Sequence, residues 1–252
     1  MSSTPVRTAS SPLAESAPGT MPAGAGEILT DFERPAPELM DRLSRLPLAN
    51  VSDAMNKLGV LHHALRPITA GTRICGPAMT CGSLDLSVKI FALWLAQPGD
   101  VFILAAGGID DYACFGELSA NILVQRGASG AIIDGAVRDV VGIRETGLPV
   151  FARAMTPRNY HYPFGQPFGA VNHPVVCGGV AVSPGDIVMA DDDGVLVVSR
   201  RIAGAVATAA AEIERQEAGR RAGIRAGAGA PAAIEQQLIE AGYRIQPRAV
   251  AA

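Results

Sequence analysis

The stretch from Gly116 to Asp139 constrains the fold more than any other part of the chain. Apolar residues recur at helical spacing from Leu118 onward, and Gly127 is a typical C-terminal helix stop. Gly130–Ile133 predicts a short buried strand, which we expect to end at Asp134-Gly135. The stretch is therefore predicted to form a helix that leaves one edge of a sheet and a strand that returns to that edge.

Helix and strand geometry then bring three charged residues together. A helix of about ten residues advances roughly 15 Å, and a strand of about five residues returns roughly 16 Å. Glu117, at the start of the helix, should therefore lie near Arg138 and Asp139, which follow the strand. Open sheets bind ligands at the carboxyl ends of their strands. Two carboxylates and a guanidinium beside a helix N-terminus suit a divalent cation and a small anionic substrate. Asp139 could also be the N-cap of a following helix over 139–144.

Composition limits the class of protein. The 252 residues are 48% hydrophobic and 18% charged, which is enough for a substantial core. The net charge of −3 argues against nucleic acid as a partner, because phosphate binding requires a basic surface. No apolar run approaches the roughly 18 residues that span a membrane. Residues 1–28 are predicted to be a disordered tail without a signal peptide, and residues 29–252 one domain with C-terminal helices. We expect a cytoplasmic protein.

The cysteines and histidines do not suggest a metal site. Neither the four cysteines nor the four histidines show zinc-binding spacing, and no Cys-x-x-Cys pair occurs. We expect reduced, mostly buried thiols. The acidic run 191–193 lacks the other ligands of a calcium loop and is predicted to be a solvated turn.

Elsewhere the pattern mixes helices with strand runs that do not strictly alternate with them, and it shows no clean domain boundary between about residues 30 and 245. Gly107-Gly108 is expected to form a loop that approaches a ligand, and Ser52 or Asp53 is expected to cap a short helix, although Asp53 could instead be catalytic. Helices are predicted over 37–46, 52–58, 86–95, 201–222 and 234–241, and strands over 65–67, 73–81, 101–105, 149–153, 175–182, 186–190 and 195–198.

Several motifs together resemble one known family. Acidic Glu117 precedes Arg138-Asp139 with twenty residues between them, which is a specific signal. The other motifs are Ser52-Asp53-Ala54, Arg73–Thr80, Pro98–Val101, Gly130–Val137, Pro149–Phe151, Pro184-Gly185-Asp186, Asp191 and Asp193-Gly194-Val195. Over about residues 37–228 the chain resembles the family of the class II 4-hydroxy-4-methyl-2-oxoglutarate (4-carboxy-4-hydroxy-2-oxoadipate) aldolases and the regulator of ribonuclease E activity A.

The resemblance implies an α/β fold and an oligomer. The fold would be an αββα sandwich resembling the swivelling phosphohistidine-type β/β/α domain. The assembly would be a homotrimer, or a hexamer made of two trimers, with active sites between subunits. A glutamate of the C-terminal helix would then reach a neighbouring subunit's site, and Glu217, with Arg221 four residues later, is the best match.

The resemblance also implies roles for the site residues. Asp139 would ligate Mg²⁺ or Mn²⁺, and Arg138 would bind a 2-oxo acid. The backbone amides of Leu118 and Ser119 would hold the substrate carboxylate, and Glu117 would orient a metal-bound water that protonates the enolate. The implied activity is a metal-dependent lyase that cleaves a 4-hydroxy-2-oxo acid to pyruvate and can decarboxylate oxaloacetate.

Two alternatives remain open. The ribonuclease E regulators share the fold but lack the full acidic set, so a binding regulator is one alternative. A hydratase, decarboxylase or tautomerase acting on another 2-oxo acid is the second.

The chain departs from the family pattern at 105–108, where a polar residue is expected. It also carries aromatic residues in the loop 155–169, at Tyr160, Tyr162 and Phe164 with His161 beside them, which could shape a pocket or pack at a subunit contact.

Overall fold

The computed structural model describes residues 26–159, 169–229 and 231–246. The tail predicted over 1–28 therefore lies almost wholly outside the described residues, as do the aromatic residues of the loop 155–169. The remaining chain is a mixed α/β fold, and this part of the predicted fold class is confirmed. The likeness to the phosphohistidine domain stays a prediction.

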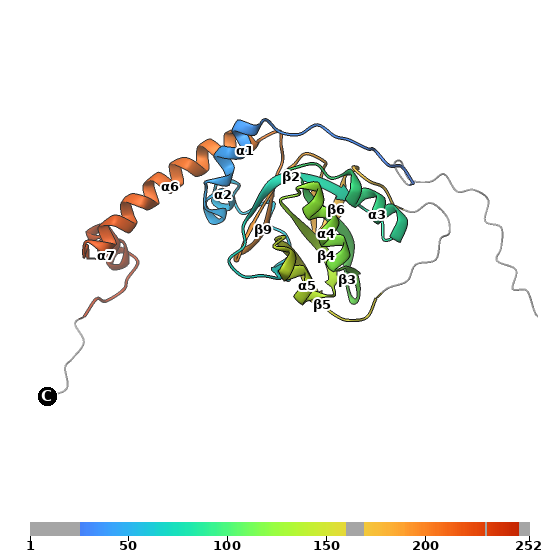
Figure 1. Cartoon of the computed structure of the whole chain (residues 1–252). Coiled ribbons are helices and arrows are strands. Elements are labelled where there is room, and N and C mark those ends of the chain that lie inside the picture. Colours follow the sequence, from blue (N-terminus) through green and yellow to red (C-terminus); the bar gives the residue numbers. More distant parts are fainter. Residues whose placement is uncertain (1–25, 160–168, 230, 247–252) are drawn as a thin grey trace, which may run out of the picture.

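A seven-stranded mixed sheet is the centre of the fold (Figure 1). Its spatial order is β1-β5-β4-β3-β2-β8-β9, and β2 to β5 run parallel to one another. A separate hairpin pairs β6 with β7. The strands are β1 (Arg66–Pro67), β2 (Ile74–Cys81), β3 (Val101–Phe115), β4 (Gly130–Val137), β5 (Val150–Met155), β6 (Val175–Cys177), β7 (Val180–Val182), β8 (Ile187–Asp191) and β9 (Gly194–Val198).

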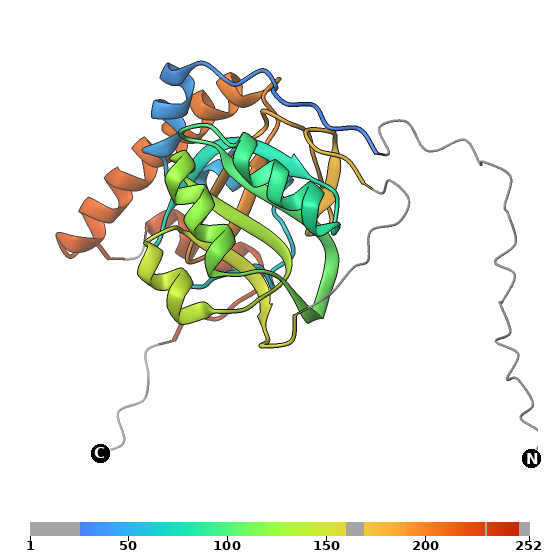
Figure 2. The ribbon, with the colours of Figure 1, turned by 45° about the vertical axis from the view of Figure 1, so that its right-hand side comes forward.

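Helices cover the sheet from two sides (Figures 1 and 2). They are α1 (Pro37–Ser44), α2 (Leu48–Ala54), α3 (Leu86–Leu95), α4 (Glu117–Arg126), α5 (Val140–Thr146), α6 (Ala203–Arg225) and α7 (Ala232–Glu240). The buried residues of α6 all lie in its first half, and its second half extends away from the sheet together with α7. None of the helices in the described ranges is both long and apolar enough to cross a bilayer.

Alternation along the strands divides the core into three apolar clusters. In β3, Phe102 packs in a cluster with α3, α4 and α5, whereas its neighbour Ile103 packs in a cluster on the opposite face of the sheet. In β8, Val188 belongs to that second cluster and Met189 to a third, which lies against α1, α2 and α6. Successive residues of a strand point to opposite faces, so both faces of the central strands are buried.

Two strands are longer than predicted. β3 continues from Val101 to Phe115, and Gly107 and Gly108, both with positive φ, lie within it rather than in a loop. Its pairing with β4 shifts register between Leu104 and Ile109, so the glycines form an irregular, bulged segment. In β4, Asp134 is buried inside the strand instead of marking its exit, because its carboxylate pairs with Arg153 of β5.

Two other local predictions were wrong. Helix α2 runs over Leu48–Ala54, so Ser52 and Asp53 lie in its last turn and do not cap a helix start. The exposed Asp53 pairs with Lys57, with 3.1 Å between Asp53 Oδ1 and Lys57 Nζ. The single strand predicted over 175–182 is a hairpin, because Gly178 and Gly179 adopt positive φ and turn the chain between β6 and β7.

Candidate active site

The ends of β3 and β4 bring Arg138 and Asp139 next to the first turn of α4. Phe115 and Val137, the last residues of these parallel strands, are paired, so the residues that follow each strand are neighbours. The Arg138 backbone N–H also donates a hydrogen bond to the Phe115 carbonyl at 3.0 Å. Glu117 begins the helix after β3, and Asp139 precedes the helix after β4. The site therefore lies at the carboxyl edge of the parallel strands, as the helix and strand lengths predicted.

Asp139 presents its carboxylate away from its own helix. Its backbone is left-handed, with φ of 56°, a conformation that aspartate tolerates better than most residues. It occupies the N-cap position of α5, but its side chain makes no capping hydrogen bond. Instead, Oδ2 lies 3.4 Å from Nε of Arg138, and both side chains remain partly exposed. The predicted N-cap position of Asp139 is therefore confirmed, but its side chain does not cap the helix, so its carboxylate is available to a ligand.

Gly116 provides the space that the Asp139 carboxylate occupies. A β-carbon at position 116 would lie 2.7 Å from Asp139 Oδ2 and 3.3 Å from Arg138 Cγ. The first distance is shorter than a van der Waals contact, so any larger residue would displace the carboxylate. The backbone at Gly116 does not itself require glycine, because its φ of −159° is extended and open to any residue. Glycine is required here because the Asp139 side chain needs the space.

Glu117 also lies against a glycine. Its side chain crosses to α5, where a β-carbon on Gly142 would be 2.7 Å from Glu117 Cγ. The Glu117 residue is exposed and does not line the cavity beside Asp139. The structure therefore places Glu117 next to the site, at the junction of α4 and α5. Its carboxylate occupies the space that a side chain at position 142 would fill.

A cavity of about 360 Å³ opens in front of Arg138 and Asp139. Its size suits a small organic acid. The first turn of α4 contributes Leu118 and Ser119, whose backbone amides precede the first hydrogen bond of that helix, from Ala120 N–H to the Gly116 carbonyl. The other lining residues are Leu86, Lys89, Ile90, Ala113, Cys114, Phe115, Gly116, Ile122 and Asn159.

Lys89 of α3 is a site residue that the sequence interpretation missed. It is only 5% exposed, and its ammonium donates a hydrogen bond to the Cys114 carbonyl at 2.6 Å. Burial lowers the pKa of Lys89, and the nearby Arg138 charge lowers it further. One feature of the sequence could have indicated that Lys89 is special. It is the one charged residue in α3, whose other residues are apolar except for Ser87.

Glu217 does not approach this cavity within one chain. It lies in the second half of α6, where its carboxylate is 3.4 Å from Arg221, and the same arginine also pairs with Glu214. Glu214 in turn accepts a hydrogen bond from Asn50 of α2 at 2.8 Å. Glu217 is therefore not among the residues that line the cavity of its own chain.

The donor set fits a hard cation bound mainly by water and substrate. In the ranges that the structure describes, no group of three His, Cys, Asp or Glu side chains could form a metal cluster. Asp139 supplies the one carboxylate among the described residues that line the cavity, whereas the Glu117 carboxylate lies over Gly142. Mg²⁺ and Mn²⁺ accept oxygen ligands, and Mg²⁺ commonly keeps several waters and one or two carboxylates, so the residues fit such an ion.

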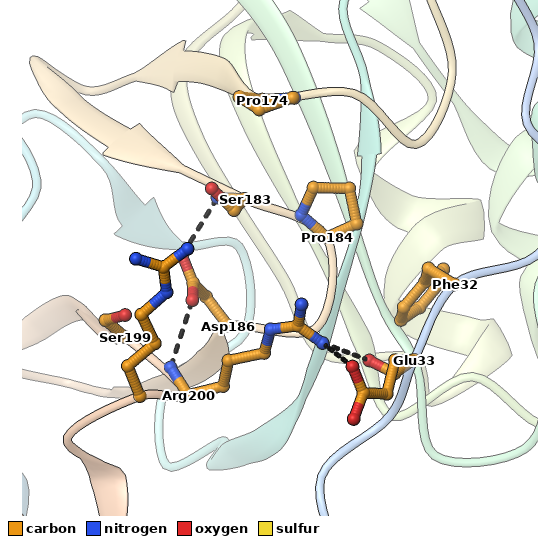
Figure 3. A pocket seen from close by; sticks show the side chains of 9 residues that line it. Phe32, Glu33, Pro174, Ser183, Pro184, Asp186, Ser199 and Arg200 are labelled. Carbon is orange, nitrogen blue, oxygen red and sulfur yellow. Dashed lines mark hydrogen bonds and ion pairs between the residues drawn. The ribbon is translucent and has the colours of Figure 1, made fainter.

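A second cavity, of about 540 Å³, lies between the N-terminal segment and the turns around β8 and β9 (Figure 3). Its two carboxylates already have partners. Asp186 accepts hydrogen bonds from the backbone N–H groups of Ser183 and Arg200, and Glu33 pairs with the Arg200 side chain at 2.7 Å. These contacts tie the segment before α1 to the sheet, so we interpret this cavity as structural.

Several known proteins are similar to this chain in sequence. A protein of Halalkalibacterium halodurans, provisionally named 4-hydroxy-4-methyl-2-oxoglutarate aldolase, is 30% identical over 165 residues, which are 65% of this chain and 77% of the relative. A Deinococcus radiodurans protein with the same provisional name is 33% identical over 155 residues, 61% of this chain and 94% of the relative.

Solved structures agree with this assignment. Streptomyces coelicolor RraAS2, described as an unusual member of the RNase ES inhibitor RraA protein family, is 31% identical with a TM-score of 0.67. The alignment covers 76% of this chain and 99% of that one. A protein from Pseudomonas syringae, 24% identical, has the same fold with a TM-score of 0.67. The sequence profile described as Aldolase/RraA matches residues 48–197, more than half of the chain, and the protein therefore belongs to the RraA-like family.

Proposed function

We propose that the protein is a divalent-metal-dependent lyase that cleaves a 4-hydroxy-2-oxo acid and releases pyruvate. The observation that carries this proposal is that Arg138, Asp139 and the first turn of α4 line one cavity of a size suited to a small acid. Relatives named provisionally as aldolases support the reaction class. When bound at Asp139, Mg²⁺ or Mn²⁺ would supply Lewis-acid stabilisation of the charge that develops on the 2-oxo group.

The chain's own residues then bind and orient the substrate. Arg138 pairs through its planar guanidinium with the 2-oxo acid, and the amides of Leu118 and Ser119 at the start of α4 hold the carboxylate. In the cleavage, the 4-hydroxyl gives its proton to a water held beside Glu117, and C4 becomes the carbonyl carbon of the second product as the C3–C4 bond breaks. The electron pair of that bond passes to C3. Glu117, beside the cavity, supports transfer of a proton to C3, which completes pyruvate. Loss of CO₂ from oxaloacetate leaves the same three-carbon fragment, so the site would also decarboxylate that acid.

We also propose that the active protein is a homotrimer or a hexamer of two trimers. Glu217 does not line the cavity of its own chain, and the second half of α6 extends away from the sheet (Figure 1), which supports a role for Glu217 at a neighbouring site. The end of α6 and the residues after it expose large apolar side chains, which favours burial against another copy. They are Ile224, Ile234, Leu238, Ile239, Tyr243 and Ile245. Analytical ultracentrifugation tests this, and a monomer at micromolar concentration would contradict it.

A coupled assay tests the reaction. The purified protein is incubated with Mg²⁺ or Mn²⁺ and either 4-hydroxy-4-methyl-2-oxoglutarate or oxaloacetate, and pyruvate is followed with lactate dehydrogenase. We expect metal-dependent pyruvate release that Arg138→Ala abolishes and that Arg45→Ala, at an exposed residue just after α1, leaves unchanged. If no 2-oxo acid yields pyruvate in the presence of metal, the lyase proposal is wrong and a non-catalytic binding role is the better interpretation.

A further inference from the structure

Lys89 is a buried cation without an anionic partner in the described part of the chain. Its only hydrogen-bond acceptor there is the neutral Cys114 carbonyl, and no aspartate or glutamate forms an ion pair with it. An ammonium group has three donors, so two remain after this bond. Buried charges in proteins are normally paired, because burial removes the stabilising contact with water.

The thiols around Lys89 do not supply the missing charge. Cys81 and Cys114 are the nearby ionisable groups of opposite sign, but burial raises the pKa of each to about 11. Both are therefore neutral at physiological pH. The other charge close to Lys89 is the Arg138 guanidinium, which has the same sign. The described lining of the cavity thus carries two cationic side chains, Lys89 and Arg138, of which only Arg138 lies near a carboxylate, that of Asp139 at 3.4 Å.

Lys89 and Arg138 reach the cavity from different elements. Arg138 follows β4, whereas Lys89 comes from α3, and both line the same 360 Å³ space. The wall of α3 next to Lys89 is apolar, formed by Leu86 and Ile90. A ligand with one acid group on Arg138 could therefore extend across an apolar surface and place a second acid group on Lys89.

We propose that Lys89 binds a second carboxylate of the substrate and so selects 2-oxo acids with two acid groups over those with one. This inference rests on the proposed function of the same cavity and names the residue that sets its specificity. Lys89 acts here as a binding residue, with no part in proton transfer. Its hydrogen bond to the Cys114 carbonyl fixes the ammonium at the cavity wall, so little ordering is required when the acid arrives.

Calorimetric titration tests the inference without turnover. The probes are 2-oxoglutarate, with two carboxylates, and 2-oxobutyrate, with one; neither has the 4-hydroxyl that cleavage requires. In saturating Mg²⁺, Lys89→Met should weaken 2-oxoglutarate binding by roughly tenfold or more and 2-oxobutyrate binding by less than about twofold. Lys89→Gln, which keeps a donor for Cys114, should show the same selectivity loss. Lys57→Met, which removes an exposed lysine, is the matched control.

Equal weakening of the binding of both acids would assign Lys89 a structural role and overturn the inference. Two other results would also overturn it: unchanged binding of 2-oxoglutarate by the Lys89 variants, or no binding of 2-oxoglutarate by the unaltered protein. Circular dichroism and thermal unfolding check that both Lys89 variants are folded. The two proposals fail separately. If 2-oxoglutarate binds selectively through Lys89 but the coupled assay detects no pyruvate from any 2-oxo acid, the lyase proposal is refuted and the assignment of Lys89 is retained. Pyruvate release with binding indifferent to Lys89 would refute only the latter.

Discussion

The Glu117 side chain lies directly over Gly142 of the next helix, where a β-carbon on residue 142 would be 2.7 Å from Glu117 Cγ. We predict that Gly142→Ala lowers pyruvate formation roughly tenfold to a hundredfold, because the new methyl group displaces the carboxylate that supports proton transfer. Glu117→Gln should give a loss of similar size while the metal still binds. The rate is measured with the lactate dehydrogenase assay.

Gly204→Ala is the control for this substitution. Gly204 also lies in a helix, α6, but a β-carbon there meets no atom within 4 Å. It should leave the rate unchanged and add about 0.5–1 kcal/mol of stability, since alanine is the better helix former. A Gly142→Ala enzyme with full activity would show that the position of Glu117 over α5 is irrelevant to the reaction.

The carboxylate of Asp139 should control metal affinity. Asp139→Asn preserves the left-handed backbone, which asparagine tolerates, and removes only the charge. We expect the Mg²⁺ concentration for half-maximal activity to rise at least about tenfold. Gly116→Ala should have the same effect by displacing the carboxylate. Asp41→Asn, on the surface of α1, is the control. Unchanged metal dependence in Asp139→Asn would contradict the assignment of the metal ligand.

Replacing Arg138 by lysine should separate charge from shape. Lysine keeps the positive charge but loses the planar pair of donors that matches a carboxylate. We predict that Arg138→Lys raises KM for the 2-oxo acid roughly tenfold or more, whereas Arg45→Lys has no effect. Steady-state kinetics at saturating metal provide the measurement. If the Arg138→Lys protein keeps the original KM, recognition of the substrate carboxylate by two donors of the guanidinium is excluded.

The buried pair of Asp134 and Arg153 should contribute to stability rather than to catalysis. Asp134 also accepts a hydrogen bond from the Gly178 backbone N–H at 2.9 Å, which ties the β6–β7 hairpin to the sheet. Asp134→Ala leaves Arg153 without its partner, so we expect a loss of about 3 kcal/mol or more in the free energy of unfolding. Asp41→Ala breaks an exposed pair and should cost less than about 1 kcal/mol. Urea denaturation measures both.

Alkaline pH should destabilise the protein through its buried thiols. Burial raises the pKa of Cys75, Cys81 and Cys114 from 9.0 to about 11. As the pH rises through this window, the unfolded chain loses thiol protons that the folded chain keeps, so stability falls from pH 9 to pH 11. Urea midpoints at about pH 8 and about pH 10.5 measure the change. Cys114→Ala should show a smaller fall, and an equal fall would assign the effect to other groups.

Sequence patterns predicted the parts of the fold that local interactions determine. Helix α3 has the predicted bounds, and Gly127 ends α4 as predicted, in a left-handed conformation. Residues governed by tertiary contacts were missed. Asp134 resembled a strand exit because its partner, Arg153, is distant in sequence, and Gly107-Gly108 resembled a loop because a bulge depends on the neighbouring strand.

The same distinction applies to the candidate site. The lengths of one helix and one strand were enough to place Glu117 near Arg138 and Asp139. They could not show that Glu117 turns toward α5, because this depends on a gap left by Gly142 in another helix. Lys89 was missed because a lysine in a helix normally faces water, and only packing against β3 buries it.

Within one chain, the residues that we propose to act around the cavity, Glu117, Arg138 and Asp139, lie in one unbroken segment from Gly116 to Gly142, and this segment also contains the two glycines that make room for their carboxylates. Recombination between relatives with breakpoints outside this segment would therefore transfer this part of the proposed reaction centre in one piece, without Glu217. The opposite wall of the cavity, supplied by α3, lies upstream and would be inherited independently. Substrate range could then diversify by exchange of that upstream segment while the bond-breaking chemistry stays fixed.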